Sequence, residues 1–374
     1  MTNSLTFIHQ ALGLAAQALF VSNPNPRVGC VITDAHGAVL GEGFTQRAGQ
    51  AHAEVMAMRD AAARGHDLRG STAYVTLEPC AHQGRTGPCC DALIAAGVAK
   101  VVASLADPNP LVAGQGFERL RAAGVEVEVG PGAQAARELN LGFFSRMVRK
   151  TPWVRMKIAA SLDGTTALNN GASQWITSAP ARADGHAWRA RACAVLTGIG
   201  TVLEDDPQLN VREVPSPRQP HLVIVDSQLQ TPPKAKLWDV PDRKVLIYGA
   251  GDAADPALQA RRKVLEERGA TVVMLPSPNG KVDLQAMLYD IATHGVNELH
   301  AEAGHKLNGS LVREDLVDEV LLYQAPLLLG SGRGLVNLGP LDDLSQGVPM
   351  EYHSVERIGP DLRIVARRVG RAHF

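Results

Sequence analysis

The segment LEPCAHQGRTGPCC, residues 77–90, contains three of the five cysteines of the chain. Upstream of it, the segment AHAEV places His52 and Glu54 two positions apart. Two thiolates and one imidazole can bind Zn²⁺ tetrahedrally and leave the fourth position open to water. The bound metal lowers the pKa of that water toward neutrality and so makes it a nucleophile. The sequence therefore predicts a zinc site formed by His52, Cys80 and Cys89.

A carboxylate two residues beyond a histidine ligand is suited to proton transfer rather than to metal binding. We expect Glu54 to move protons between the water, a ring nitrogen and departing ammonia, as a general acid and base does. The pattern H-x-E followed by P-C-x-x-C is typical of zinc deaminases. Here eight residues, AHQGRTGP, replace the usual two between the cysteines. The sequence thus predicts hydrolytic deamination, with a longer loop beside the metal.

Two other interpretations of the cysteines are open from the residues alone. A closed structural zinc site would take His82 or Cys90 as a fourth ligand, and inert buried thiols would take no metal. A structural site has no use for the proton transfer that Glu54 supplies, which favours the catalytic interpretation. Cys30 and Cys193 lie in apolar segments and are expected to be core thiols. Adjacent side chains diverge, so no metal role is expected for Cys90.

The loop PCAHQGRTGPC, together with NPNPRVG at residues 23–29, resembles the deaminase domain of the bifunctional riboflavin-biosynthesis enzymes. Enzymes of that family deaminate a diaminopyrimidinone ribosylamine phosphate and then reduce its ribose. The resemblance implies that substrate is bound in this domain by Asn23, His82, Arg85, Asp107 and Asn109. Thr45 stands where the family often has a histidine, so one polar substrate contact is expected to differ.

The second half of the chain carries no metal-binding pattern. The segments GIGTVL and GSGRGL each lack the final glycine of G-x-G-x-x-G, so a Rossmann dinucleotide fold is not predicted. Five segments resemble, in the same order, the reductase domain of the same family: KIAASLDG, SQWITS, GIGTVLEDDPQLNVR, VDSQ and AEAG. The resemblance implies a dihydrofolate-reductase-like fold and NADPH as the cofactor.

The same resemblance assigns residues to the cofactor and to the substrate. The cofactor site would comprise Ala159, Trp175, Thr201, Asp205, Ser227, Gly304, His305, Lys306, Leu307, Asn308, Gly309 and Ser310. The substrate would be held by Ser173, Arg189, Leu209, Arg212 and Glu302. Arginine forms bidentate contacts with phosphate, which suits Arg189 and Arg212 to a phosphorylated ribose. Solvated surface charge is the alternative for both arginines, and a core position is the alternative for Trp175. Lys157 is expected to polarise a ring-opened aldehyde or to bind phosphate.

Two series of alternating strand and helix patterns must position these residues. In the first, a hairpin over 27–44, with its turn at His36 and Gly37, and a helix ending near residue 65 precede short alternating strands and helices, and one helix over 133–150 closes the series. The second begins with a strand at 152–164, continues as a mixed sheet and ends in a hairpin over 350–369. We predict a cytidine-deaminase-like α/β/α sandwich over residues 1–149 and a dihydrofolate-reductase-like α/β domain over 150–374.

Length and composition narrow the remaining possibilities. The chain of 374 residues is too long for one ordinary core, and its 45% apolar and 20% charged residues are typical of globular domains. The net charge is −1 and the sequence has no Lys/Arg tract, which disfavours a nucleic-acid partner. No apolar run approaches the length of a membrane span, and the N-terminal segment lacks a basic leader. These features predict a cytoplasmic location without membrane association.

We therefore expect a bifunctional enzyme that binds Zn²⁺ and NADPH, acts on a small phosphorylated pyrimidine and forms a homo-oligomer. One rival is a zinc deaminase of nucleosides or tRNA fused to an unrelated reductase. The nearly neutral first half, with 13 basic and 12 acidic residues up to residue 150, counts against a tRNA substrate. The other rival is a zinc-stapled protein without catalytic activity, against which Glu54 counts.

Overall fold

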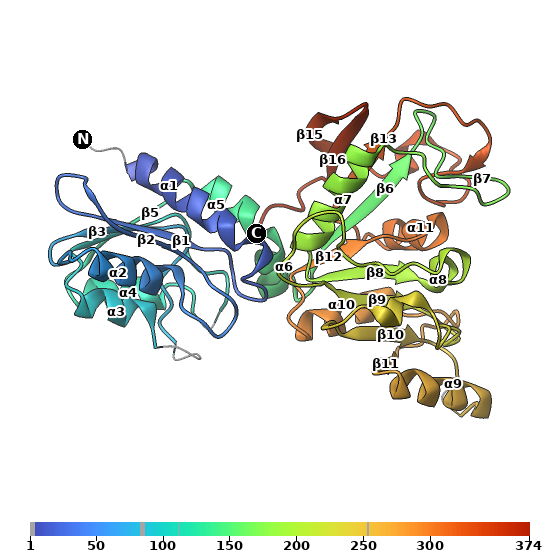
Figure 1. The fold of residues 1–374 in the computed structure, drawn as a ribbon, viewed down its shortest axis with the longest axis horizontal. Helices are drawn as coiled ribbons and strands as arrows, with labels where there is room; N and C mark the ends of the chain where they lie inside the picture. The colour runs from blue at the N-terminus through green and yellow to red at the C-terminus, as the bar shows by residue number, and fades with distance from the viewer. Residues whose placement is uncertain (1–3, 83–86, 111, 253) are drawn as a thin grey trace. The chain divides into compact units, whose positions relative to one another are not determined.

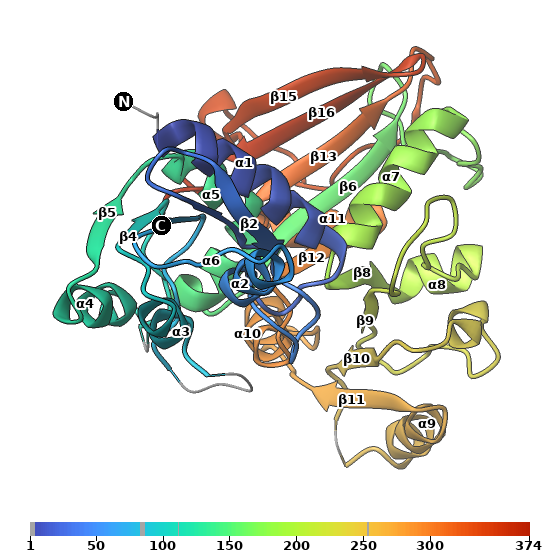
Figure 2. The same cartoon turned by 60° about the vertical axis from the view of Figure 1, so that its left-hand side comes forward.

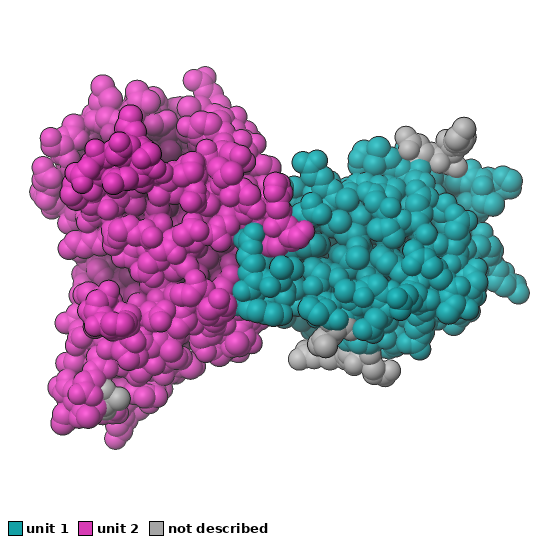
Figure 3. Space-filling view, turned by 180° about the vertical axis from the view of Figure 1, so that it is seen from behind, with its two compact units in different colours: residues 1–150 teal, residues 151–374 magenta. Residues whose placement is uncertain are grey.

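The computed structural model of the chain describes residues 4–82, 87–110, 112–252 and 254–374. The chain divides into two compact units, residues 1–150 and 151–374, which Figure 3 distinguishes by colour. Within the described residues, no helix is both long and apolar enough to cross a membrane.

One sheet forms the centre of the first unit. Its strands are β1 (Gly29–Thr33), β2 (Val39–Phe44), β3 (Thr72–Val75), β4 (Lys100–Ala103) and β5 (Glu126–Val129). They lie in the order β2-β1-β3-β4-β5, with β1 antiparallel to β2 and β3 and with β3, β4 and β5 parallel. The hairpin between β1 and β2 turns where the sequence predicts, because the Asp34 carboxylate accepts hydrogen bonds from the N–H groups of His36 and Ala38. Gly37 supplies the positive φ, +88°, that this turn requires.

Helices cover both faces of this sheet (Figure 1). They are α1 (Ser4–Gln17), α2 (Ala53–Ala63), α3 (Cys89–Ala95), α4 (Gln115–Ala122), α5 (Ala133–Leu139), α6 (Leu141–Arg149) and the short 3-10 helix η1 (Ala18–Phe20). Ile8 of α1 and Ala136 of α5 share one core with Val31 and Val102 of the sheet, while α2, α3 and α4 lie on the other face. The unit is thus the predicted three-layer sandwich.

The helix predicted over 133–150 is in fact two helices, α5 and α6, separated at Asn140. Asn140 is buried, and its side-chain oxygen accepts a hydrogen bond from the N–H of Arg27 at 2.8 Å. Its amide donates to the carbonyl oxygens of Arg27 and Ala136. Asparagine side chains that bond to backbone groups compete with helical hydrogen bonding. The break therefore anchors the start of α6 to the segment that precedes β1.

A larger mixed sheet forms the centre of the second unit. Its strands are β6 (Trp153–Ala160), β8 (Ala194–Gly198), β9 (His221–Val225), β10 (Val245–Gly249), β11 (Ala270–Met274), β12 (Glu298–Ala301), β13 (Glu319–Gln324), β15 (Met350–Ile358) and β16 (Asp361–Arg368). The order is β11-β10-β9-β8-β12-β6-β13-β16-β15, which can be followed in Figure 2. Strands from β11 to β13 pair in parallel, and β16 and β15 add an antiparallel edge. A small ribbon joins β7 (Ala167–Leu168) to β14 (Gly332–Arg333).

An apolar core lies on each face of this sheet, between the strands and the helices that cover them. The helical elements are α7 (Ala179–Arg191), α8 (Ile199–Asp205), α9 (Pro256–Glu267), α10 (Leu284–Thr293), α11 (His305–Arg313), η2 (Lys236–Asp239) and η3 (Leu344–Gln346). Met156 of β6 packs in one core with Met287 of α10 and Leu311 of α11. On the opposite face, Ile224 of β9 packs in a second core with Leu265 of α9. Successive side chains of each strand thus point to opposite faces of the sheet, as the two-residue period of a β-strand requires.

A buried ionic cluster lies beneath α7 in this unit. Arg155 on β6 is 2% exposed and contacts Glu319 at 2.5 Å and Glu298 at 2.8 Å. Arg191 also donates to Glu298, and Arg367 donates to Glu319. Burial alone would raise the pKa of Glu319, but Arg155 and Arg367 hold it below its ordinary value. The cluster ties four strands and a helix together through charges that depend on one another.

Candidate active sites

The thiols of Cys80 and Cys89 converge on the imidazole of His52 in the first unit. Their Sγ atoms lie 3.6 Å and 3.4 Å from Nδ1 of His52, respectively. The ligand atoms of the three residues all lie within 4.8 Å of one another. Among the described residues, these three form the group that could hold a metal ion. Zn–S and Zn–N bonds of about 2.3 and 2.1 Å in a tetrahedron would separate sulfur and nitrogen by about 3.6 Å. The three side chains therefore fit a zinc ion with one open position.

Two helix starts position these ligands. His52 is the N-cap residue of α2 and Cys89 is the first residue of α3. The N–H of Cys89 donates to Sγ of Cys80 at 3.4 Å, and the N–H of Cys90 donates to the carbonyl oxygen of Cys80. Hydrogen bonds from the Cys89 side chain and from His52 lower the pKa of Cys80 to about 4, although burial opposes them. The thiol of Cys90 instead faces Asp91, so it takes no part in the cluster.

Glu54 lies in the first turn of α2 and is buried. Burial is the main reason that its pKa is raised to about 7, and the neighbouring Cys80 adds to the shift while His52 opposes it. A carboxylate with a pKa near neutrality can both accept and release a proton at physiological pH. The structure thus places a titratable acid beside the three metal ligands.

These residues line a cavity of about 470 Å³. Three residues predicted to bind substrate, His82, Asp107 and Asn109, also line it. The stretch that follows Asn23 contributes Pro24 and Asn25 to the wall. Thr45 lines the cavity and turns its hydroxyl toward the carbonyl oxygen of Val28. Arg85 lies outside the described residues.

Glu78, which was not predicted from the sequence, precedes the metal loop and holds a neighbouring part of the cavity wall in place. Its Oε2 accepts hydrogen bonds from the N–H groups of Asp107 at 3.0 Å and Gly114 at 2.9 Å. Its Oε1 accepts from the N–H groups of Gly116 and Phe117 at the start of α4. A Cβ on Gly116 would come within 2.0 Å of the carbonyl oxygen of Pro79, so only glycine fits there. Glu78 therefore fixes the segment that carries Asp107 next to the metal loop.

Arg146 is the other residue of this cavity that sequence reasoning missed. It lies on α6, far from the recognised motifs in the sequence, and it lines the cavity with Phe143 and Met147. The helix that carries it was predicted, but nothing in the sequence indicated which side of the helix faces the site.

The cavity of the second unit lies where parallel strands end. It measures about 560 Å³ and is lined by residues at or beyond the ends of β6, β8 and β12. In α/β sheets, ligands bind outside the carboxyl ends of the strands. Of the residues predicted from the sequence, it is lined by Ala159, Ser173, Trp175, Arg189, Thr201, Asp205, Leu209, Arg212, Glu302, Gly304, His305 and Asn308.

The remaining predicted cofactor residues lie outside the lining of this cavity among the described residues. They are Ser227, Lys306, Leu307, Gly309 and Ser310. Gly309 packs α11 against the backbone of Asn337, because a Cβ there would come within 2.0 Å of the Asn337 carbonyl oxygen. Ser227 follows β9, and its carbonyl oxygen accepts from the N–H groups of Ala250 and Gly251.

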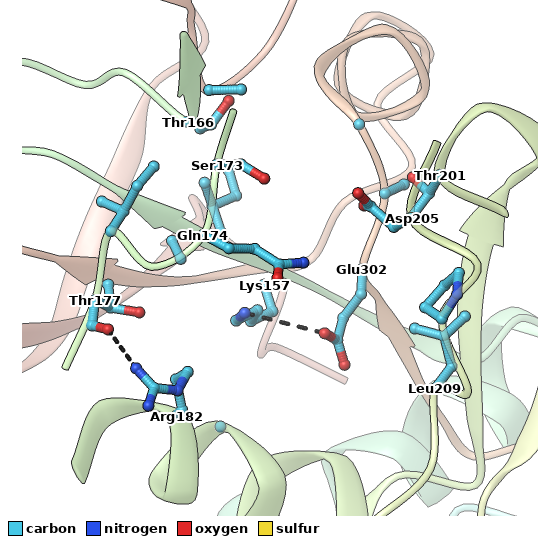
Figure 4. Close-up of a pocket in the computed structure, with 18 of the residues that line it drawn as sticks. Lys157, Thr166, Ser173, Gln174, Thr177, Arg182, Thr201, Asp205, Leu209 and Glu302 are labelled. Atoms are coloured by element: carbon cyan, nitrogen blue, oxygen red, sulfur yellow. Dashed lines mark hydrogen bonds and ion pairs between the residues drawn. The ribbon is translucent and has the colours of Figure 1, made fainter. Parts of the chain in front are cut away.

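Glu302 and Lys157 face each other across the floor of this cavity (Figure 4). Nζ of Lys157 lies 4.0 Å from Oε2 of Glu302. Arg189 binds both oxygens of Glu302, at 2.6 and 2.8 Å, and donates to the carbonyl oxygen of Asn210. Burial lowers the pKa of Lys157, although Glu302 opposes the shift. Burial would raise the pKa of Glu302, but Arg189 holds it well below its ordinary value. Glu302 is thus an anion fixed by Arg189.

Arg212 and His186 lie at the side of the same cavity. The N–H of Arg212 donates to Nδ1 of His186 at 3.4 Å, and its guanidinium donates to Asn210 at 3.1 Å. Burial, Arg189 and Arg212 lower the pKa of His186 to about 3, so the imidazole is neutral and accepts this hydrogen bond. Arg212 itself is exposed, unlike the buried Arg189.

The opposite wall is built from the start of α11 and from α8. Gly304 is the N-cap of α11 and no side chain caps the helix. A Cβ on Gly304 would lie 4.0 Å from Oγ1 of Thr201, and Gly304 and His305 line the cavity, so the start of the helix borders it. Uncapped helix N-termini bind phosphate groups. This wall therefore fits a cofactor that carries phosphates.

Together these sites define a two-domain protein in which a zinc deaminase of the cytidine deaminase type precedes a reductase domain. Residues 1–105 match the zinc-binding region of cytidine and deoxycytidylate deaminases, and residues 152–364 match the RibD C-terminal domain. The chain belongs to the RibD family of riboflavin biosynthesis proteins. It is a deaminase and reductase of riboflavin biosynthesis, with the predicted deaminase-like and dihydrofolate-reductase-like fold classes.

Relatives and solved structures cover both units. The riboflavin biosynthesis protein RibD of Escherichia coli K12 is 42% identical over 95% of this chain and 97% of its own length. The RibD of Aquifex aeolicus is 37% identical over 97% and 98%. A structure of Acinetobacter baumannii RibD has a TM-score of 0.87 at 39% identity, covering 97% and 98%. A deaminase/reductase structure from Thermotoga maritima has a TM-score of 0.84 at 32% identity, covering 98% of both chains.

Proposed function

We propose that residues 1–149 deaminate 2,5-diamino-6-(5-phosphoribosylamino)pyrimidin-4-one to 5-amino-6-(5-phosphoribosylamino)uracil. Residues 150–374 then reduce the ribosyl group of this product to ribityl with NADPH. The open ligand set of His52, Cys80 and Cys89 beside the buried Glu54 is the observation that carries the first step. The Thermotoga maritima relative is named a diaminohydroxyphosphoribosylaminopyrimidine deaminase and 5-amino-6-(5-phosphoribosylamino)uracil reductase, which supports this choice of substrates.

In the deaminase site, His52, Cys80 and Cys89 would hold the zinc ion. When bound, the metal supplies Lewis acidity that lowers the pKa of a water molecule toward neutrality. Glu54 takes one proton from this water and gives it to the ring nitrogen. It then takes the second proton from the hydroxyl that has been added to the ring and gives it to the amine, so that a carbonyl forms as ammonia leaves. Its burial in the cavity excludes bulk water from these transfers. Asn23, His82, Arg85, Asp107 and Asn109 hold the pyrimidine and its sugar in this proposal.

In the reductase site, the start of α11 and the side chains of Thr201 and Asp205 would bind the phosphates and ribose of NADPH. Ala159, Trp175, Ser227 and the run 304–310 complete the proposed cofactor site. When bound, the cofactor supplies the hydride. The protein contributes mainly by holding the reacting carbon of the sugar against the cofactor.

The substrate of the reduction would lie over Lys157 and Glu302. Lys157 donates a hydrogen bond to the ring oxygen of the ribose and stabilises the negative charge that develops there as the ring opens. The opened ribosylamine has an imine at its C1′ carbon, which accepts the hydride while the imine nitrogen takes up a proton. Glu302 fixes Lys157 and is itself fixed by Arg189. Arg212 binds the substrate phosphate, with Ser173 and Leu209 at the sides. The exposed guanidinium of Arg212 is the better phosphate ligand, because Arg189 is committed to Glu302.

One experiment tests this function as a whole. The protein is incubated with the diaminopyrimidinone and NADPH, while ammonia release and NADPH oxidation are followed separately and zinc content is measured. We expect one zinc per chain, ammonia release without NADPH, and NADPH oxidation only after deamination. Activity on a nucleoside or tRNA with none on this compound would support a fused deaminase of other specificity. Stoichiometric zinc without ammonia release would support a structural metal. The cytoplasmic location and the homo-oligomeric state stay predictions.

A further inference from the structure

Among the described residues that line it, the deaminase cavity has one arginine and no lysine. The arginine is Arg146, whereas Glu54, Glu78 and Asp107 supply carboxyl groups. The proposed substrate carries a phosphate monoester, which has a charge of about −1.5 to −2 at neutral pH. Carboxylates in a partly enclosed cavity repel such a group, so binding it requires a cation nearby. Arg146 is the described residue that can supply this cation, and Arg85 of the metal loop lies outside the described residues.

The surroundings of Arg146 hold its guanidinium at the cavity wall. It lies over the ring of Phe143, 6.0 Å from the ring centroid. One Nη2 hydrogen is donated to the carbonyl oxygen of Pro24 at 3.2 Å. Asn140 anchors the start of the same helix through its hydrogen bonds with Arg27. The helix, the aromatic ring and the 23–29 segment therefore limit the positions that this side chain can adopt.

The chemistry of guanidinium matches phosphate. Its planar fork presents five N–H donors and remains charged at all physiological pH values, so it can bind two phosphate oxygens at once. We propose that Arg146 binds the phosphate of the deaminase substrate and makes this site selective for the phosphorylated compound over its dephosphorylated form. This inference rests on the proposed function, because it assigns the specificity of the proposed reaction.

A purely structural role for Arg146 is the competing account. In that case its hydrogen bond to Pro24 would hold the 23–29 segment, and its loss would disturb the cavity for any substrate. The two accounts differ in one measurable respect. A phosphate ligand acts only on substrates that carry phosphate, whereas a structural tie acts on both forms equally.

The test measures how fast the Arg146→Gln protein releases ammonia from each of two substrates. One substrate is the diaminopyrimidinone with its ribose phosphate, and the other is the same compound after phosphatase treatment. We expect kcat/KM for the phosphorylated compound to fall roughly 30-fold or more, as when one partner of a charged pair is removed. For the dephosphorylated compound it should change by less than about twofold. Arg146→Lys should retain part of the preference, because it keeps the charge and loses the planar fork.

Arg149→Gln is the matched control, because Arg149 lies on the same helix and outside the lining of the cavity. It should leave both substrates unaffected. Reduction of the added uracil intermediate should be normal in all variants and shows that the second unit is folded, while unchanged zinc content shows that the metal site of the first unit is intact. Equal losses on both substrates would establish the structural account, and unchanged kinetics would place the phosphate elsewhere.

A binding measurement keeps the proposal testable if the proposed substrate is wrong. In that case the unmodified protein would release no ammonia from either compound. Ribose 5-phosphate can still be titrated calorimetrically into Arg212→Gln protein, in which the second site is weakened, and into the same protein that also carries Arg146→Gln. Loss of the binding heat in the second protein supports the phosphate site. Equal heats in the two proteins overturn it.

Discussion

The cavities of the two units differ in the charge that lines them. Among the described residues, the first cavity is lined by one arginine, Arg146, and by three residues with carboxyl groups. The second cavity is lined by the cationic side chains Lys157, Arg182, Arg189, Arg212, Lys236 and Arg333. Carboxylates accompany them there as well, at Glu204, Asp205, Glu213 and Glu302. The second cavity therefore offers cations at several points, as a site for a phosphorylated cofactor and a phosphorylated substrate would require.

The two cavities also differ in how the chain assembles them. In the first, the metal ligands come from two helix starts and one loop, and Glu54 follows His52 by two residues. In the second, Lys157 lies within β6 and Glu302 directly follows β12, and these two neighbouring parallel strands are far apart in the sequence. The first site thus depends on two short segments of the sequence, whereas the second site depends on how the strands of the whole sheet are aligned. Substitutions should therefore separate the two activities cleanly.

Glu54→Gln should have the largest effect and should be confined to the first cavity. The substitution keeps size and hydrogen bonding but removes the group that moves protons, so ammonia release should fall by roughly 10²- to 10⁴-fold. Zinc content should stay at the unmodified level, because the three ligands remain. NADPH oxidation should stop with the diaminopyrimidinone and return when the deaminated intermediate is added directly.

The exposed Glu118→Gln on α4 is the control for this variant. It should leave both reactions unchanged. If the folded Glu54→Gln protein failed to oxidise NADPH even with the intermediate present, the assignment of two separate sites would be wrong.

Glu319→Gln tests the dependence of the second unit on its buried charges. Removing one partner from such a cluster leaves Arg155 without full compensation and should cost about 3–5 kcal/mol of unfolding free energy. All four tryptophans lie between residues 153 and 238, so their fluorescence reports the unfolding of the second unit. Because Arg155 and Arg367 lower the pKa of Glu319, its contribution is present above the ordinary glutamate pKa and is lost as the pH falls through the lowered value.

The difference in stability between the unmodified protein and Glu319→Gln should therefore shrink when denaturant melts are repeated at acidic pH. Glu351→Gln, an exposed residue on the neighbouring edge strand β15, should be neutral at every pH. A difference that grows on acidification would contradict the charge assignment.

Arg212→Gln should separate the two phosphate sites. We expect it to lower kcat/KM of the reduction by about 2–4 kcal/mol in free-energy terms, because a charged contact with the substrate phosphate is lost. Ammonia release should stay normal, since Arg212 lines only the second cavity. Arg357→Gln, exposed on β15, provides the control. Equal losses in both reactions would indicate misfolding rather than lost phosphate binding.

Much of the fold was predictable because local patterns report strands and helices well. The hairpin turn at His36 and Gly37 is confirmed, as is the antiparallel hairpin over β15 and β16. The break at Asn140 was not predicted, because it depends on a hydrogen bond to Arg27, which is 113 residues away in the sequence. The helices α9 and α10 and the strand β12 are present in the structure but were not predicted from the sequence. The strand that was not predicted, β12, ends directly before Glu302.

The site residues also differ in whether the sequence alone could indicate their roles. His52, Cys80 and Cys89 could be grouped from spacing because their chemistry is specific to metals. Arg146 and Glu78 could not, because an arginine on a helix and a glutamate before a loop have many ordinary roles. Their partners, the carbonyl oxygen of Pro24 and four backbone N–H groups, come from distant segments and carry no sequence signal.

Glu78→Gln should have the smallest effect of these variants and should alter substrate binding more than proton transfer. The carboxylate accepts four backbone hydrogen bonds, and an amide would turn a donor group toward two of those N–H groups. One or two unsatisfied buried donors cost about 1–3 kcal/mol, which the segment carrying Asp107 and Asn109 can relieve by moving away from the cavity. KM of the deamination should therefore rise about 10-fold with a smaller change in kcat. Zinc content and reduction of the added intermediate should be unchanged, and Glu118→Gln on α4 again serves as the control. A loss of zinc would show that Glu78 supports the metal loop itself rather than the neighbouring part of the cavity wall.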